Sequence, residues 1–254
     1  MLFRSESPPN IVFIMADDLG YADLSSYGSS FINTPNLDQM ADDGVKLTSY
    51  YSAQAVCSAS RAAILTGSYP NRIGIHGAFG PKSKKGINPF ELTIPEMLSY
   101  KGYRTGIFGK WHLGSKEDFL PTRHGFDEFY GFRGGARNYW PYQEPPKDPL
   151  RKWERNFKQF VEPEGYLTDV IANEAEKSIE RNKENPFFLF VSFNAPHTPM
   201  HFLEDDLPDK DIRLTDKRRQ LYAMMKSMDR ACGKILDKLE KLGLTENTLI
   251  IFTN

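Results

Sequence analysis

Apolar and polar positions along the chain follow two patterns, one typical of buried strands and one typical of amphipathic helices. Apolar runs of strand length cover residues 10–16, 186–194 and 248–253, and residues 103–108 are also expected to form a strand. A run without alternating polar residues is typical of a strand buried on both faces, as in a parallel sheet. Apolar residues at helical spacing lie between these runs, over residues 167–181 and 217–242. The pattern predicts an α/β fold with a mostly parallel central sheet and helices on both faces.

Local start and stop signals predict the smaller elements. A helix is expected to begin after the capping residue Thr34, with Pro35 in its first turn, and to run through Asp43. Thr93 and Glu96 form a capping-box pattern at the start of a short helix. We expect a strand over residues 45–52 and loops over residues 68–91 and 133–165.

Length and composition are those of an ordinary soluble globular protein. The 254 residues suffice for the core of one α/β domain, with 40% hydrophobic and 26% charged residues. The net charge of −1 gives no reason to expect nucleic acid or an anionic membrane as a partner. No apolar run reaches the roughly 18 residues of a membrane span, and residues 1–9 lack the basic end and apolar stretch of a secretory signal. With two cysteines, Cys57 and Cys232, no disulfide framework is expected.

Two adjacent acids, Asp17 and Asp18, directly follow the first apolar run. Ligand sites in parallel sheets lie beyond the carboxyl ends of the strands, so these acids stand where chemistry is expected. Adjacent carboxylates repel each other unless a cation or solvent separates them. From spacing alone, a solvated loop or a helix cap stays open as an alternative to a metal site.

Cys57 lies at the start of a run of small, helix-forming residues that ends near Gly67, and Arg61 follows four positions later. Residues i and i+4 share a helix face, so Arg61 is expected close to Cys57. A cysteine at a helix start lies at the positive end of the helix dipole, and a nearby cation further favours an anionic or electrophile-bound form. The alternative is a buried core cysteine, which is the interpretation for Cys232 within the apolar stripe of the 217–242 helix.

Further candidates follow the later strands. Lys110 and His112 come after the 103–108 strand and point the same way in an extended turn, so the lysine can hold an anion while the histidine moves protons. His76 is expected on the surface, and His201 is a weaker pocket candidate. For five residues of the 133–165 loop, a substrate pocket and an ordinary loop stay equally open. They are Arg133, Arg137, Asn138, Tyr139 and Trp140.

Several motifs together resemble the type I sulfatases. The segment from Cys57 to Arg61, followed by Ala-Ala-Ile-Leu-Thr-Gly67, is similar to the signature pentapeptide of that family. Five other segments match further family signatures in the family's order, namely Pro9–Tyr21, Thr34–Asp38, Thr105–Gly114, His124–Asp127 and Ala195–Pro199. The resemblance implies an alkaline phosphatase/sulfatase-like fold.

The resemblance implies a modified nucleophile and a metal ion. In the family the cysteine at the position of Cys57 is oxidised to formylglycine by a separate maturation enzyme, which would be a partner of this protein. Asp17, Asp18 and the residue at position 57 would be metal ligands, and all-oxygen ligation favours Ca²⁺, with Mg²⁺ as the alternative. Ala59 stands where the family usually has proline, as in some bacterial sulfatases, which leaves the maturation system open.

Four more residues receive roles from the resemblance. Arg61 and Lys110 would bind the sulfate, His112 would hold and deprotonate the formylglycine hydrate, and His197 would protonate the leaving oxygen. The expected reaction is hydrolysis of a sulfate ester on a small molecule or an oligosaccharide, with a sulfated carbohydrate favoured. Phosphate or phosphonate ester hydrolysis and an inactive fragment are the alternatives.

The resemblance also gives expectations about the extent of the chain. The acid and amide that complete the family's metal site usually follow the position of Asn254, so residues 1–254 are expected to be the N-terminal part of the catalytic domain. The sheet would then be incomplete at its C-terminus, and the small C-terminal domain would be absent. We expect this chain alone to have weak or no activity, and the full-length protein to be periplasmic or secreted.

Overall fold

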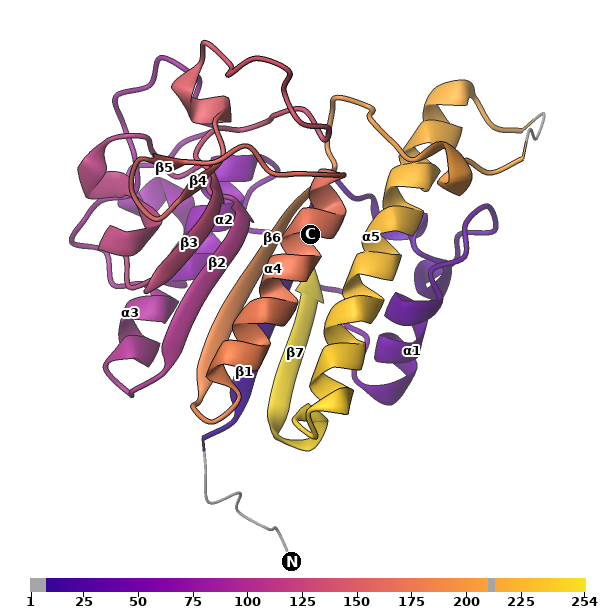
Figure 1. The fold of residues 1–254 in the computed structure, drawn as a ribbon, viewed down its shortest axis with the longest axis horizontal. Helices are drawn as coiled ribbons and strands as arrows, with labels where there is room; N and C mark the ends of the chain where they lie inside the picture. Colours follow the sequence, from indigo (N-terminus) through magenta and orange to yellow (C-terminus); the bar gives the residue numbers. More distant parts are fainter. Residues whose placement is uncertain (1–7, 210–212) are drawn as a thin grey trace, which may run out of the picture.

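The computed structural model describes residues 8–209 and 213–254, which form a seven-stranded sheet in the order β5-β4-β3-β2-β6-β1-β7 (Figure 1). The pairs among β3, β2, β6, β1 and β7 are all parallel, and only β4 and β5 pair antiparallel. The prediction of a mostly parallel sheet is therefore confirmed. The strands are β1 Asn10–Asp17, β2 Arg104–Lys110, β3 Glu128–Phe132, β4 Glu154–Arg155, β5 Gln159–Phe160, β6 Phe187–Pro196 and β7 Thr248–Thr253.

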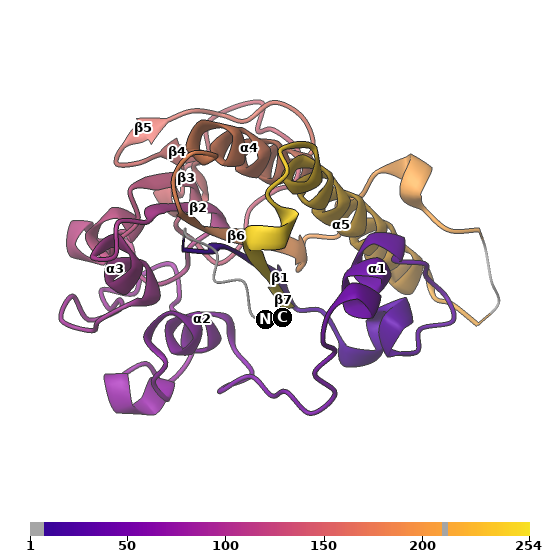
Figure 2. The ribbon, with the colours of Figure 1, turned by 90° about the horizontal axis from the view of Figure 1, so that it is seen from below.

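Helices cover both faces of the sheet, with α4, α5 and α1 on one face and α2 and α3 on the other (Figure 2). The α-helices are α1 Pro35–Asp43, α2 Cys57–Thr66, α3 Ile94–Ser99, α4 Leu167–Asn182 and α5 Asp216–Lys241. Short 3-10 helices are η1 Tyr21–Asp23, η2 Ser25–Tyr27, η3 Pro70–Ile73, η4 Glu117–Phe119, η5 Pro121–Arg123, η6 Pro149–Arg151, η7 Glu204–Asp206 and η8 Thr245–Asn247. The predicted capping box of α3 is present.

Each central strand feeds two hydrophobic cores because successive side chains point to opposite faces of a sheet. In β1, Val12 and Ile14 pack with α4 and α5, whereas Met15 packs with α2. In β6, Leu189 belongs to the first core, and Phe190 belongs to the second, where it stacks on Phe13 at 5.2 Å between ring centres. Burial on both faces explains why these strands are apolar throughout.

The prediction of a strand over residues 45–52 is wrong. This segment is irregular, and Val45, Leu47 and Tyr51 are exposed. Strand-forming side chains need a neighbouring strand edge or a packed face, and this segment has neither among the described residues. The 133–165 loop was expected to be irregular, but it contains η6 and the short β4–β5 pair.

Two further predictions have different outcomes. Strand β2 continues two residues further than predicted and includes Lys110, so this lysine is fixed by the sheet and not by a loop. The first seven residues, on which the absence of a secretory signal partly rests, lie outside the described residues. Within the described residues, none of the helices combines the length and apolar character needed to cross a membrane.

Candidate active site

The carboxyl edge of the sheet gathers the predicted site residues from β1, β2, β6 and α2. Asp17 ends β1, Lys110 ends β2, and His197 follows β6. Cys57 opens helix α2, whose C-terminal side packs on the sheet through Ala62 and Leu65. Parallel neighbouring strands end at the same edge, so residues far apart in sequence meet there.

Asp17 is the centre of a buried charge cluster. Its Oδ2 accepts a 2.5 Å hydrogen bond from Lys110 Nζ, and its Oδ1 lies 3.4 Å from Arg61 Nη2. Burial by itself would raise the pKa of Asp17, but the charges of Arg61 and Lys110 outweigh it, so the net pKa is lowered. Asp17 is therefore a carboxylate between two cations.

Ser192 links the Arg61 side chain to the main chain of Lys110. Its Oγ accepts a 2.5 Å hydrogen bond from Arg61 Nη1 and donates a 2.6 Å bond to the Lys110 carbonyl. Arg61 also donates to the same carbonyl at 3.0 Å. A polar residue inside the apolar run of β6 was the sequence signal for this role, but the sequence reasoning did not use it.

Cys57 is a half-buried thiol at the first residue of α2. Its pKa is lowered to about 6, first because the thiolate can accept hydrogen bonds from His112 and then from His197. Burial and the charge of Asp17 act in the opposite direction, and Lys110 adds to the lowering. The thiol is thus placed and acidified for chemistry at its sulfur.

Backbone carbonyls orient both imidazoles toward this thiol. His112 Nε2 lies 2.8 Å from the Phe79 carbonyl, and His197 Nδ1 lies 2.6 Å from the Thr198 carbonyl. A carbonyl only accepts, so these nitrogens carry ring protons. In the neutral ring the opposite nitrogen has a lone pair, and in the imidazolium form it carries a second proton that the Cys57 thiolate can accept. His112 Nδ1 is buried, and the His112 ring also interacts with the Cys57 sulfur. The pKa of His197 is raised, first through its interaction with Cys57, against the effect of burial.

Close packing fixes the His112 ring from the other side. A Cβ built on Gly135 would lie only 2.6 Å from His112 Cε1, so a larger residue there would displace the ring. The main chain of His112 adopts φ of 58°, and that of Asp18 adopts φ of 66°, both in the left-handed region. Such strain at non-glycine residues is typical of functional sites.

Tyr139 supports the turn that carries His197. Its hydroxyl lies 2.6 Å from the Asn194 carbonyl and 2.8 Å from the His197 carbonyl, so it can donate to either. Tyr139 is buried, and no spacing rule connects it to a residue 58 positions away.

The predicted residues divide into two groups. Asp17, Cys57, Arg61, Lys110, His112 and His197 are brought together, and Asp18 lies at the rim with a 62% exposed side chain. The loop residue Arg133 pairs with the buried Glu154 at 2.6 Å, and the buried Arg137 pairs with the partly exposed Glu162 at 2.5 Å. The structure therefore favours the ordinary-loop interpretation for both arginines. Trp140 is partly exposed, His76 is exposed beside Asn71, and Cys232 is buried as predicted.

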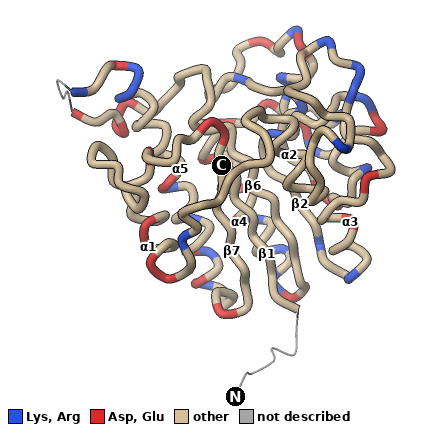
Figure 3. The backbone as a smooth tube through the Cα atoms, turned by 180° about the vertical axis from the view of Figure 1, so that it is seen from behind, with Lys and Arg blue, Asp and Glu red and all other residues tan. Residues whose placement is uncertain are grey.

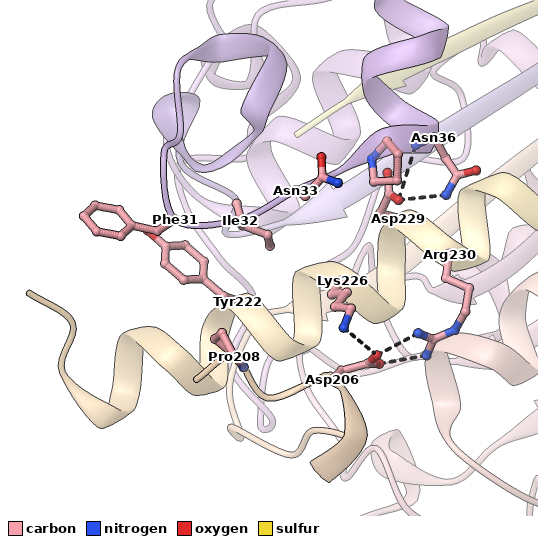
Figure 4. Close-up of a pocket in the computed structure, with 11 residues that line it drawn as sticks. Phe31, Ile32, Asn33, Asn36, Asp206, Pro208, Tyr222, Lys226, Asp229 and Arg230 are labelled. Carbon is pink, nitrogen blue, oxygen red and sulfur yellow. Dashed lines mark hydrogen bonds and ion pairs between the residues drawn. The ribbon is translucent and has the colours of Figure 1, made fainter. Parts of the chain in front are cut away.

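A separate cavity of about 410 Å³ lies between α1 and α5 (Figure 4). Its charged side chains are already paired, because Arg230 holds Asp206 at 2.8 Å and Asp229 accepts the Leu37 N–H at the start of α1. Asp229 therefore caps α1 and fixes it to α5. The charges of the molecule are otherwise interspersed along the backbone (Figure 3).

The acids at the end of β1 fit a hard divalent cation in donor type, since Ca²⁺ and Mg²⁺ prefer carboxylate oxygens. The Asp18 side chain is largely exposed, and its contact with His197 Nε2 is 3.6 Å long, so its oxygens can still ligate. The oxygens of Asp17 lie between Arg61 and Lys110. Asp17 and Asp18 would hold one side of such an ion.

A parallel sheet with a buried charge cluster at its carboxyl edge defines an α/β domain with a ligand site at that edge. The family model described as Sulfatase matches residues 9–254, and the chain belongs to this family. The predicted family and fold are thus confirmed.

Two curated relatives illustrate the match. N-acetylgalactosamine-6-sulfatase of Rattus norvegicus is 36% identical over 267 residues, covering 97% of this chain and 49% of the relative. An arylsulfatase of Hemicentrotus pulcherrimus is 37% identical over 261 residues, covering 96% of this chain and 46% of the relative. The chain therefore spans about half the length of the curated relatives it matches.

Solved structures agree with this fold. The crystal structure of Ps i-CgsB superposes with a TM-score of 0.90 at 37% identity, covering 97% of this chain and 58% of that chain. Its complex with k-i-k-neocarrahexaose gives a TM-score of 0.91 at 36% identity, over 97% of this chain and 58% of the other. The PsFucS1 sulfatase from Pseudoalteromonas sp. superposes with a TM-score of 0.79 at 29% identity, covering 96% of this chain and 54% of that chain.

Proposed function

We propose that the complete protein hydrolyses sulfate esters of carbohydrates, with a formylglycine made from Cys57 as nucleophile and Ca²⁺ or Mg²⁺ at Asp17 and Asp18. Residues 1–254 would supply the N-terminal part of its catalytic domain. The observation that carries the proposal is the convergence of Cys57, two cations and two oriented imidazoles at one buried carboxylate. The names of the relatives and the oligosaccharide bound to Ps i-CgsB support a sulfated sugar as substrate.

The cations would bind and orient the sulfate group. Arg61 and Lys110 present positive charge from a buried position, where electrostatic interactions are stronger than in water. Asp17 contacts both cationic groups, and Ser192 holds the Arg61 guanidinium against the Lys110 main chain, so little reorganisation is needed when charge develops on the sulfate. A divalent ion at Asp17 and Asp18 supplies further charge stabilisation when bound.

The two histidines have complementary proton roles in this proposal. A hydrated aldehyde at position 57 supplies one hydroxyl as nucleophile and a second whose deprotonation releases sulfate. The lone pair of His112 Nδ1 is the base that would take this second proton, because Nε2 is committed to Phe79. His197, whose pKa is raised, would protonate the leaving oxygen at Nε2.

The decisive experiment compares turnover of an aryl sulfate and an aryl phosphate by the full-length protein produced with a maturation enzyme. Peptide mass of position 57 is measured in parallel, since formylglycine is about 18 Da lighter than cysteine. Sulfate turnover in proportion to the converted fraction is expected. Preferred phosphate turnover, or sulfate turnover by the unconverted protein, would overturn the proposal.

A further inference from the structure

We infer that the unconverted, cysteine form of this site binds a thiophilic divalent cation such as Zn²⁺ through Cys57 Sγ, His197 Nε2 and a carboxylate oxygen of Asp17. This site shares Asp17 and position 57 with the proposed Ca²⁺ site but has a different donor set. It exists before any conversion to formylglycine, so it does not depend on sulfate hydrolysis.

The three donor atoms are close enough to share one ion. One ligand atom each from Asp17, Cys57 and His197 lie within 4.8 Å of one another. A point central to three such atoms is at most about 2.8 Å from each, while Zn²⁺ needs about 2.0–2.3 Å. Side-chain adjustments of less than about 1 Å would complete the bonds.

The histidines are already held as zinc ligands require. In metal sites a ligating histidine usually donates its other ring N–H to a carbonyl or carboxylate, which fixes the tautomer and raises its basicity. Thr198 does this for His197, whose Nε2 is 3.6 Å from Asp18 Oδ2 and whose ring interacts with Cys57. Phe79 does it for His112, whose ring also interacts with Cys57 and whose buried Nδ1 would be the fourth ligand.

The donor types select the ion. A thiolate and imidazoles with one carboxylate favour Zn²⁺ over Ca²⁺ or Mg²⁺, which prefer oxygen. Binding replaces the thiol proton, which leaves to solvent, so no oxidant or reductant is required. Exchange of the thiol proton for Zn²⁺ makes the cluster around Asp17 one unit more positive, because Arg61 and Lys110 already face this carboxylate. The Asp18 carboxylate, 3.6 Å from His197 Nε2, lies close enough to offset the added charge.

Conversion of Cys57 to formylglycine would change which metal ion the site prefers. Loss of the sulfur removes the soft ligand and introduces oxygen, so the converted protein should lose zinc affinity. Conversely, bound zinc would occupy the sulfur and shield Cys57 from electrophiles. The same cluster at the sheet edge would thus bind zinc before conversion and a hard cation afterwards.

The test uses the chain produced without a maturation enzyme, with unconverted Cys57 verified by peptide mass, freed of metal by chelation. Zn²⁺ affinity is measured by competition with a chromophoric chelator, and Co²⁺ is added to detect thiolate-to-cobalt absorption. We expect one equivalent bound, with affinity lowered at least about 100-fold in Cys57→Ser and His197→Ala. Cys232→Ala, a cysteine outside the site, should bind as the unaltered chain does.

Circular dichroism establishes that each variant is folded before it is titrated. The second readout is protection of the Cys57 thiol from alkylation, which needs no variant. Saturating Zn²⁺ should slow alkylation of Cys57 at least about 10-fold, whereas Ca²⁺ should not. Absence of binding, equal binding by Cys57→Ser, or alkylation unaffected by Zn²⁺ would each overturn the inference. Because no turnover is measured, failure here is distinct from failure of the sulfatase proposal.

Discussion

Cys57 and Cys232 carry the same side chain in opposite settings. Cys57 is half-buried at the first residue of α2, beside two imidazoles and Lys110, and its pKa is lowered to about 6. Cys232 is fully buried within α5, and burial, followed by the charge of Asp229, raises its pKa far above the ordinary range. Residue type alone therefore says little about reactivity, and the position relative to the sheet edge decides it.

The comparison extends to the regions around the two thiols. At the sheet edge, polar groups of β1, β2 and β6 are buried and paired with one another around Asp17. On the α5 face, Cys232 lies within the apolar first core, and Asp229 is the charged group that acts on it. The sheet edge holds buried charged groups that can act on a substrate, whereas the core around Cys232 excludes water and stabilises the fold.

The largest expected effect separates the two thiols by activity. In the converted full-length enzyme, Cys57→Ala should lower turnover of an aryl sulfate about 10³-fold or more, because the nucleophile is lost. Cys232→Ala should change kcat less than about 2-fold, since this side chain contacts only the core. Full turnover by Cys57→Ala would show that the two cysteines do not differ in the proposed way.

The second effect concerns alkylation of the unconverted chain. At pH 7 without added metal, iodoacetamide should modify Cys57 at least about 100-fold faster than Cys232, as followed by peptide mass spectrometry. With a pKa of about 6, Cys57 is mostly thiolate at pH 7 and protonated at pH 5, so its rate should fall as pH decreases through 6. A rate that rises up to pH 9 would contradict the lowered pKa.

The third effect concerns stability, for which the substitution of Cys232 should have the larger effect and that of Cys57 the smaller. Cys232→Ala leaves a small cavity under α5 and should lower the free energy of unfolding by about 1–2 kcal/mol in urea. The Cys57 pKa is lower in the folded than in the unfolded chain, so its thiolate stabilises the fold above the unfolded pKa and this contribution is lost as pH falls through 6. At pH 5.5, Cys57→Ala should therefore cost less than Cys232→Ala, and the opposite order would contradict the comparison.

The sequence was informative where a single strand or helix carried the information. Apolar runs predicted β1, β6 and β7, and the resemblance to a family predicted most of the residues that meet at the sheet edge. The segment 45–52 has strand-forming residues, but a strand exists only if another edge pairs with it, which local sequence does not report.

The supporting contacts of the site could not be predicted, because they join residues without a fixed spacing. Phe79 bonds to His112, 33 positions away, and Tyr139 reaches the carbonyl of His197, 58 positions away. Arg133 and Arg137 were equally compatible with a pocket and a loop until their carboxylate partners were known. Such roles depend on tertiary packing.

The smallest effect tests whether the reactive region depends on its supports. Ser58, next to Cys57 in α2, accepts a 3.0 Å hydrogen bond from the Phe79 N–H, and the Phe79 carbonyl in turn lies 2.8 Å from His112 Nε2. Ser58→Ala removes the first bond and loosens the second, so kcat should fall about 3- to 10-fold with KM nearly unchanged. Rates are normalised to the converted fraction at position 57. Thr66→Ala, whose hydroxyl bonds the Ala62 carbonyl in the same helix, is the matched control, and an equal loss in both variants would refute a positioning role.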